Sequence, residues 1–307
     1  MQPTDAGSSE LAPESEAPME GAPVPRGIWG KWLTACYVGP FLVYMLVGMF
    51  EPGPPKVIEN PTDEQIATGD IPPGAPDKDG VRRDADGHPI GPDDELDDDG
   101  YVQIPYKWYP RVYTIKIIAT TTVLLLALPA YLVFRLRINA VALLVGVVGV
   151  VAWIGICKLN LEQKLLVPMG LGSIVEMGER PGFNPLEQIK DDPNWAYGFL
   201  AIRLFGLAIL VPIIEEFFLR VFLVRFVMDV DWFKIPFGKV DRLGLITSIA
   251  FPMLMHPAEL FAAAAWFGMI TWLMLRTRNI WDCVAAHAVT NALLGAYVIA
   301  TGEWQFM

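Results

Sequence analysis

Residues 140–157 read AVALLVGVVGVVAWIGIC, an uncharged apolar run. A transmembrane helix needs roughly 18–20 predominantly apolar residues, and this run reaches that length. Residues 32–50 form a second uncharged run, with Pro40 inside it. These two runs exclude a single soluble domain and predict a protein that lies in the membrane.

Apolar segments of similar length fill most of the remaining chain. We expect an all-α fold, a polytopic helical membrane bundle of about seven transmembrane helices, because helices satisfy their own backbone hydrogen bonds in lipid. One of these helices contains Pro212, where it is expected to kink. The expected helices are 32–50, 113–134, 140–157, 195–228, 243–256, 260–275 and 280–300.

Acidic residues are concentrated in the first third of the 307-residue chain. Residues 1–110 carry 20 acidic and 7 basic side chains, whereas residues 111–307 carry 14 and 16. The net charge of −11 is therefore a local property, and a nucleic-acid binder with a broad basic face is excluded. We predict a disordered tail at 1–29, a first transmembrane helix at 30–50, an acidic Pro/Gly-rich insertion at 51–110 and a membrane bundle at 111–307.

The insertion 51–110 also raises the question of calcium. An EF-hand loop needs Gly at its sixth position and Glu at its twelfth. Counting from Glu95, Gly100 is sixth but Tyr106 is twelfth. A solvated acidic loop is therefore favoured over a specific calcium site.

Basic residues in short loops predict the orientation, because such residues are enriched on the cytoplasmic side. If successive helices cross the membrane in alternating directions, the basic residues of the short loops lie on one side of the membrane. That side is then the cytoplasm, and the N-terminus is cytoplasmic. The insertion 51–110 and the C-terminal residues 304–307 are then extracytoplasmic, in a multi-pass protein of the cell membrane. The residues are Arg26, Lys31, Arg135, Arg137, Lys234, Lys239, Arg242, Arg276 and Arg278.

Ionisable residues in a membrane helix are costly and call for an explanation. Glu215, Glu216 and Arg220 stand in the otherwise apolar run 211–220. Glu216 and Arg220 are four residues apart on one helix face, where a charge-assisted pair can form. Glu215 is rotated by about 100° and remains available for another task. Two other membrane cations, Lys116 and Arg203, are expected to be paired or to extend toward the interface.

Two of the three histidines and one asparagine add to this polar set. His256 and His287 lie in apolar helices, and Asn291 shares a helix face with His287. A carboxylate assisted by an imidazole can deprotonate water, and an imidazole with an amide can donate to an oxyanion. We therefore predict that these residues converge from separate helices to hydrolyse an amide bond.

The same residues resemble a known family. Glu215-Glu216-x-x-x-Arg220, a later helix ending in His256, and His287-x-x-x-Asn291 look like the three motifs of the CPBP family, the CAAX prenyl endopeptidase and bacteriocin-processing group, also called Abi. The likeness spans roughly residues 195–300. A wider likeness, from Arg180 through Tyr297 to Trp304, resembles the exosortase-associated, CAAX prenyl protease-related subgroup.

The resemblance implies an intramembrane endopeptidase. By the family's roles, Glu215 and His256 would activate water and His287 with Asn291 would form the oxyanion site. Glu216 and Arg220 would support this arrangement. The sequence departs from the family where Pro252 replaces a phenylalanine four residues before His256, which weakens the assignment of that histidine.

Residue types leave the question of a metal open. Glu215, His256 and His287 are possible zinc ligands, but the HExxH spacing is absent. We favour a metal-free mechanism with no cofactor, with zinc as the alternative.

Other functions also remain open. The expected partners are the bilayer and a membrane-associated peptide or protein, and not nucleic acid. One alternative is a non-catalytic membrane binding or immunity protein on the same scaffold. A less favoured alternative is a proton-coupled transporter. Many transporters are built from inverted repeats, and we find no such repeat in this sequence.

Overall fold

The computed structural model describes residues 23–56, 58, 60–173 and 182–307. It is mostly helical, which confirms the predicted all-α membrane fold. The predicted disordered tail 1–29 lies mainly outside the described residues. The longer helices are α2 (Leu33–Gly48), α4 (Tyr109–Tyr131), α5 (Ala140–Lys158), α9 (Pro193–Phe205), α12 (Arg242–Leu254), α13 (Leu260–Thr277) and α14 (Ile280–Thr301).

Shorter elements connect and extend these helices. They are α1 (Ile28–Lys31), α3 (Asp63–Thr68), η1 (Tyr106–Trp108), α6 (Leu161–Leu165), η2 (Val167–Met169), α8 (Pro185–Gln188), η3 (Gly206–Leu210), α10 (Val211–Glu216), η4 (Phe217–Leu223), α11 (Val224–Phe226), η5 (Trp232–Lys234), η6 (Pro257–Glu259) and η7 (Trp304–Phe306). The strands are β1 (Arg82–Arg83), β2 (Pro89–Ile90), β3 (Glu95–Leu96) and β4 (Val102–Gln103).

Within the described residues, five helical spans are long and apolar enough to cross a membrane, and α2 and α12 are shorter apolar helices. The predicted count of seven is therefore not confirmed. The five spans are Tyr106–Tyr131, Ala140–Met169, Pro193–Phe226, Pro257–Thr277 and Ile280–Thr301.

The span Pro193–Phe226 carries the Glu-Glu motif and is not a regular α-helix. It runs through α9, α10 and α11 with two π-helical segments, η3 and η4, between them. π-Helical turns inside α-helices are rare and are frequent at functional sites, because they change the direction in which side chains point. Glu215 and Glu216 lie between the two π segments.

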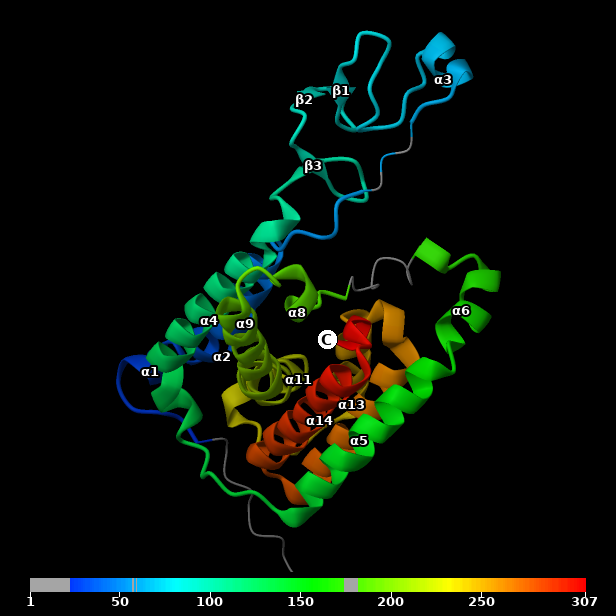
Figure 1. Cartoon of the computed structure of the whole chain (residues 1–307). Helices are drawn as coiled ribbons and strands as arrows, with labels where there is room; N and C mark the ends of the chain where they lie inside the picture. The colour runs from blue at the N-terminus through cyan, green and yellow to red at the C-terminus, as the bar shows by residue number, and fades with distance from the viewer. Residues whose placement is uncertain (1–22, 57, 59, 174–181) are drawn as a thin grey trace, which may run out of the picture.

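Small residues allow α5 to lie close against α13 and α14, as Figure 1 shows. A Cβ atom on Gly146 would lie 2.7 Å from the carbonyl oxygen of Ala286, and one on Gly149 would lie 2.8 Å from Thr290 Oγ1. Such close approach requires glycine and is a common way to pack membrane helices. It brings the histidine-bearing helix α14 against α5.

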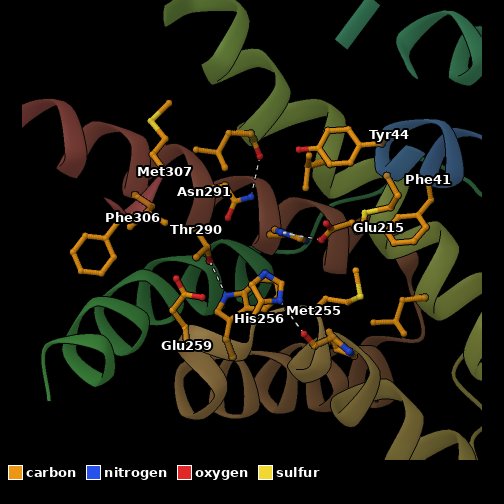
Figure 2. A pocket seen from close by; sticks show the side chains of 18 of the residues that line it. Phe41, Tyr44, Glu215, Met255, His256, Glu259, Thr290, Asn291, Phe306 and Met307 are labelled. Atoms are coloured by element: carbon orange, nitrogen blue, oxygen red, sulfur yellow. Dashed lines mark hydrogen bonds and ion pairs between the residues drawn. The ribbon is translucent and has the colours of Figure 1, made fainter. Parts of the chain in front are cut away.

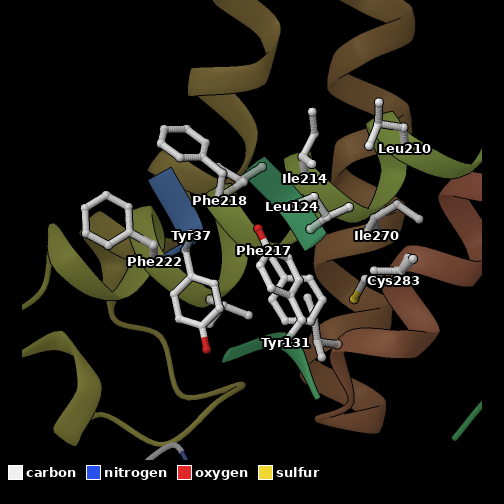
Figure 3. Close-up of a cluster of buried hydrophobic side chains, with 14 of the residues drawn as sticks. Tyr37, Leu124, Tyr131, Leu210, Ile214, Phe217, Phe218, Phe222, Ile270 and Cys283 are labelled. Carbon is white, nitrogen blue, oxygen red and sulfur yellow. The ribbon is translucent and has the colours of Figure 1, made fainter. Parts of the chain in front are cut away.

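An aromatic cluster joins α2 and α4 to the motif helix, the span Pro193–Phe226 that carries Glu215 and Glu216 (Figure 3). Phe217, the residue after the Glu-Glu pair, is fully buried and its ring lies 4.3 Å from that of Tyr131 and 5.8 Å from that of Tyr37. Tyr37 donates a hydrogen bond to the carbonyl of Ala130, which satisfies its buried hydroxyl. This packing fixes the rotation of the helix that presents Glu215 and Glu216.

The acidic insertion stands away from the bundle and contains α3 and two short antiparallel hairpins (Figure 1). Its aspartates form three similar turns, in which Asp77, Asp84 and Asp97 each accept a backbone N–H four residues ahead. Backbone N–H donors of this kind hold the pKa of Asp77 below its usual range, against the opposing effect of burial. These aspartate side chains thus stabilise turns, a role that is compatible with the solvated acidic loop favoured from the sequence. The domain boundaries and the predicted orientation stay predictions.

Candidate active site

All four predicted catalytic residues line one cavity of about 360 Å³. Glu215 reaches it from α10, His256 from the turn after α12 and Asn291 from α14 (Figure 2). His287 also reaches it from α14. Aromatic and aliphatic side chains such as Phe41 form much of the rest of the wall. A largely apolar pocket with a few convergent polar groups is the usual form of a ligand or active site.

Glu216 does not share the exposure of its neighbour Glu215. The side chain of Glu215 is 26% exposed, whereas Glu216 is fully buried. Glu216 Oε2 accepts from Nε of Arg220 at 2.5 Å, and Arg220 Nη1 donates to Thr271 Oγ1 at 3.2 Å. The structure therefore forms the i, i+4 pair expected from the sequence and anchors it on α13.

His287 lies between the two glutamates. Its Nδ1 is 3.0 Å from Glu216 Oε1, and its Nε2 is 4.0 Å from Glu215 Oε2. An anionic Glu216 beside Arg220 favours a proton on Nδ1, which leaves Nε2 directed toward Glu215 and the cavity. His287, which was predicted for the oxyanion site, thus also approaches Glu215.

Asn291 is held by the backbone of the motif helix. Its Nδ2 donates to the carbonyl oxygen of Leu207 at 2.9 Å. In the π-helical segment η3, Val211 N–H bonds the carbonyl of Gly206, and the next residue, Pro212, has no N–H to give to Leu207. Asn291 therefore supplies the donor that Pro212 lacks, and its side chain also lines the cavity.

His256 is positioned by the proline that marks the departure from the family pattern. Helix α12 ends at Leu254, so His256 lies just beyond it, at the start of η6. Its Nδ1 lies 2.8 Å from the carbonyl of Pro252, and its ring contacts those of Trp153 and Phe267. The expected helix 243–256 is thus two residues too long, but His256 still lines the shared cavity.

Four charged residues of the cavity wall were not predicted to belong to it: Glu51, Lys116, Arg203 and Glu259. Lys116 is only 4% exposed and its Nζ lies 2.5 Å from Glu51 Oε1, over the rings of Tyr44 and Tyr113. Glu51 lines the cavity too, as does Glu259, three residues after His256. The i, i+3 spacing of His256 and Glu259 was the available signal for Glu259. Glu51 and Lys116 come together only through the pairing of α2 with α4.

The last described residues close one side of the cavity. Phe306 and Met307 line it, and Arg203 donates to the carbonyl oxygens of Phe183 and Met307. Glu303, just beyond α14, accepts from the hydroxyl of Tyr297 and lies 3.2 Å from Lys158 Nζ. The hydrogen bond from Tyr297, together with Lys158, holds the pKa of Glu303 below its usual range.

The zinc alternative gains no support from the donor geometry. Among the residues that the structure describes, no three His, Cys, Asp or Glu side chains gather closely enough to hold one metal ion. Four ligands at roughly 2.0–2.3 Å are the norm for zinc, or three with an open position.

Comparison with known families supports the same segment. Residues 197–293 match the family described as type II CAAX prenyl endopeptidase Rce1-like. This match confirms the relationship to CAAX prenyl endopeptidases that the motifs indicated, over residues that include Glu215, His256 and His287. No curated protein and no solved structure gives a significant match. A membrane-embedded protease type of function is therefore supported for this chain.

Proposed function

We propose that the protein is an intramembrane endopeptidase that cleaves a peptide bond of a membrane-associated protein or peptide with a water activated by Glu215. The observation that carries the proposal is the shared cavity, which joins Glu215, His287 and Asn291 from two helical spans with His256 from the turn after α12. Burying this many polar side chains in a membrane bundle is costly, so a purely structural role is a poor explanation.

The contacts support a division of labour between the two glutamates. Glu215 is partly exposed to the cavity and is the general base, which takes a proton from water as the water attacks the scissile carbonyl. Glu216 is buried against Arg220 and orients His287 through Nδ1. Because Nε2 of His287 lies 4.0 Å from Glu215, one water molecule can contact both groups.

His256 and Asn291 complete the proposed chemistry. The imidazole of His256 assists water activation from the opposite wall, where the Pro252 carbonyl fixes its ring. Asn291 donates through its amide to the oxygen of the tetrahedral intermediate, and His287 donates to it from Nε2 as the imidazolium, with a proton on each ring nitrogen. In measured cases, removing one such donor costs about 10²–10³ in kcat. After the C–N bond breaks, the proton held by Glu215 passes to the leaving amine.

The test compares membrane-protein termini in cells that carry wild type or Glu215→Gln, which removes the base but keeps the side-chain volume. We expect the termini produced by cleavage to disappear, since general base catalysis contributes about 10²–10⁴-fold. Glu187→Gln, on the exposed part of α8, is the matched control and should leave them unchanged. Identical termini in wild type and Glu215→Gln would remove the proposal. A peptide held by both but cut by neither would favour a binding protein.

A further inference from the structure

A second cavity, a groove of about 350 Å³, lies at the base of the acidic insertion. One wall is the end of α2 and the segment after it, with Met49 and Phe50. The other is the β3–β4 hairpin, with Asp98 and Val102. Glu51 lines both this groove and the catalytic cavity, so the two adjoin at that residue.

The groove is held open by backbone and side-chain bonds between its walls. The amide of Gln103 both donates to the carbonyl of Gly53, at 2.9 Å, and accepts from its N–H, at 3.0 Å. Lys56 N–H bonds the carbonyl of Leu96 at 2.9 Å, and Lys56 Nζ lies 3.2 Å from the carbonyl of Asp98. A groove fixed in this way is already shaped for a ligand and loses little conformational entropy on binding.

Its lining combines exposed apolar surface with negative charge. Met49 is 78% exposed, Phe50 65% and Val102 49%. Asp97 and Asp98 add carboxylates, and the insertion 51–110 as a whole carries 15 acidic and 5 basic side chains. This mixture of apolar and acidic side chains fits an extended polypeptide in which basic and apolar residues alternate. Successive side chains of such a strand point to opposite sides, so they can contact different walls of the groove.

We propose that this groove is a docking site for the surface segment of a membrane-anchored substrate, a stretch rich in basic and apolar residues that leads to the scissile bond. The inference rests on the proposed peptidase function. The groove begins where α2 ends, so a chain emerging from the bilayer beside α2 passes along the groove and reaches the catalytic cavity at Glu51. The Glu51–Lys116 pair stands at this junction.

Adjacent aspartates provide a matched test. Asp98 lines the groove, whereas Asp99 is also exposed but does not line it. Binding of a fluorescein-labelled peptide of alternating lysine and leucine is measured by anisotropy on full-length Glu215→Gln protein in lipid nanodiscs. The same peptide with glutamate in place of lysine is the specificity control.

We expect the lysine peptide to bind more tightly than the glutamate peptide. Asp98→Lys should weaken its binding about fivefold, because repulsion replaces attraction, and Asp99→Lys by less than about twofold. A photoreactive residue in place of Val102 should crosslink to the lysine peptide. Equal effects of the two aspartate variants, equal binding of both peptides, or no crosslink would overturn the docking site.

The inference and the proposed function can fail separately. The binding assay uses protein that lacks the proposed base, so it does not depend on cleavage. In active protein, Asp98→Lys should raise KM for a substrate with a basic surface segment and leave kcat unchanged. Normal peptide docking with wild-type cleavage by Glu215→Gln would remove the peptidase mechanism alone.

Discussion

Glu216 Oε1 lies 3.0 Å from His287 Nδ1 and thereby links α10 to α14 in the interior of the bundle. The opposite carboxylate oxygen of Glu216 accepts from Arg220. The buried carboxylate of Glu216 thus contacts both His287, which faces Glu215, and Arg220, whose positive charge balances that of the carboxylate.

The first prediction follows from this double contact. Glu216→Gln should lower the free energy of unfolding by about 3–5 kcal/mol, because it leaves the charge of Arg220 buried without its counter-ion. Cleavage should fall as well, because His287 loses its fixed orientation. Thermal unfolding of the purified protein and the cleavage assay measure the two effects.

Arg220→Met in the Glu216→Gln background serves as the control. The double variant should recover part of the lost stability, because no unpaired charge then remains. Cleavage should not recover with it, because His287 still lacks its carboxylate. A double variant less stable than Glu216→Gln would contradict this explanation.

The sequence predicted the local part of the site and left its assembly open. Helical spacing placed Glu216 with Arg220 and turned Glu215 away from them, and these relations hold in the structure. The approach of His287 to Glu215 depends on how α10 lies against α14. Contacts between distant parts of the chain, such as the hydrogen bond from Asn291 Nδ2 to the carbonyl oxygen of Leu207, hold these segments together, and no local pattern reveals them.

The second prediction concerns Asn291 and the carbonyl of Leu207. Asn291→Ala should cost about 1–3 kcal/mol of stability, because that carbonyl loses its donor. In a Pro212→Ala background the cost should shrink, since residue 212 then has an N–H to offer to Leu207. A double-mutant cycle of unfolding free energies checks this coupling, and additive costs would show that Pro212 does not create the need for Asn291.

The third prediction is a loss of order at low pH around residues 304–307. Because the pKa of Glu303 is lowered in the folded protein, its stabilising contribution is complete above the ordinary glutamate pKa of about 4.3. It is lost as the pH falls through the lowered pKa. Hydrogen exchange at 304–307 should therefore speed up below about pH 4, and Glu303→Gln should show fast exchange already at pH 7. Equal exchange in wild type and variant at pH 7 would exclude this anchor.

The turns of the insertion show a pattern that sequence analysis overlooked. Asp77, Asp84 and Asp97 each begin a D-x-D-G stretch, and the glycines Gly80, Gly87 and Gly100 all have positive φ. This Asp and Gly chemistry is a turn signal. Interpreted only as metal ligands or solvated charge, the aspartates did not reveal the two hairpins, of which β3–β4 forms one wall of the groove.

The last prediction uses two glycines of the same helix. Gly149→Ala places a methyl group 2.8 Å from Thr290 Oγ1 and from Trp266 Nε1, so α5 must move away from α13 and α14. We expect a loss of about 1–3 kcal/mol of stability from overpacking, despite the better helix propensity of alanine. Cleavage should fall too, since Thr290 and Trp266 line the catalytic cavity beside His287.

Gly155→Ala gains the same propensity and meets no atom of the described residues within 4 Å, so it should leave stability and cleavage intact. Thermal unfolding and substrate cleavage of the two variants, measured in parallel, separate helix packing from helix propensity. If Gly149→Ala behaves like Gly155→Ala, the close contact of α5 does not hold the site.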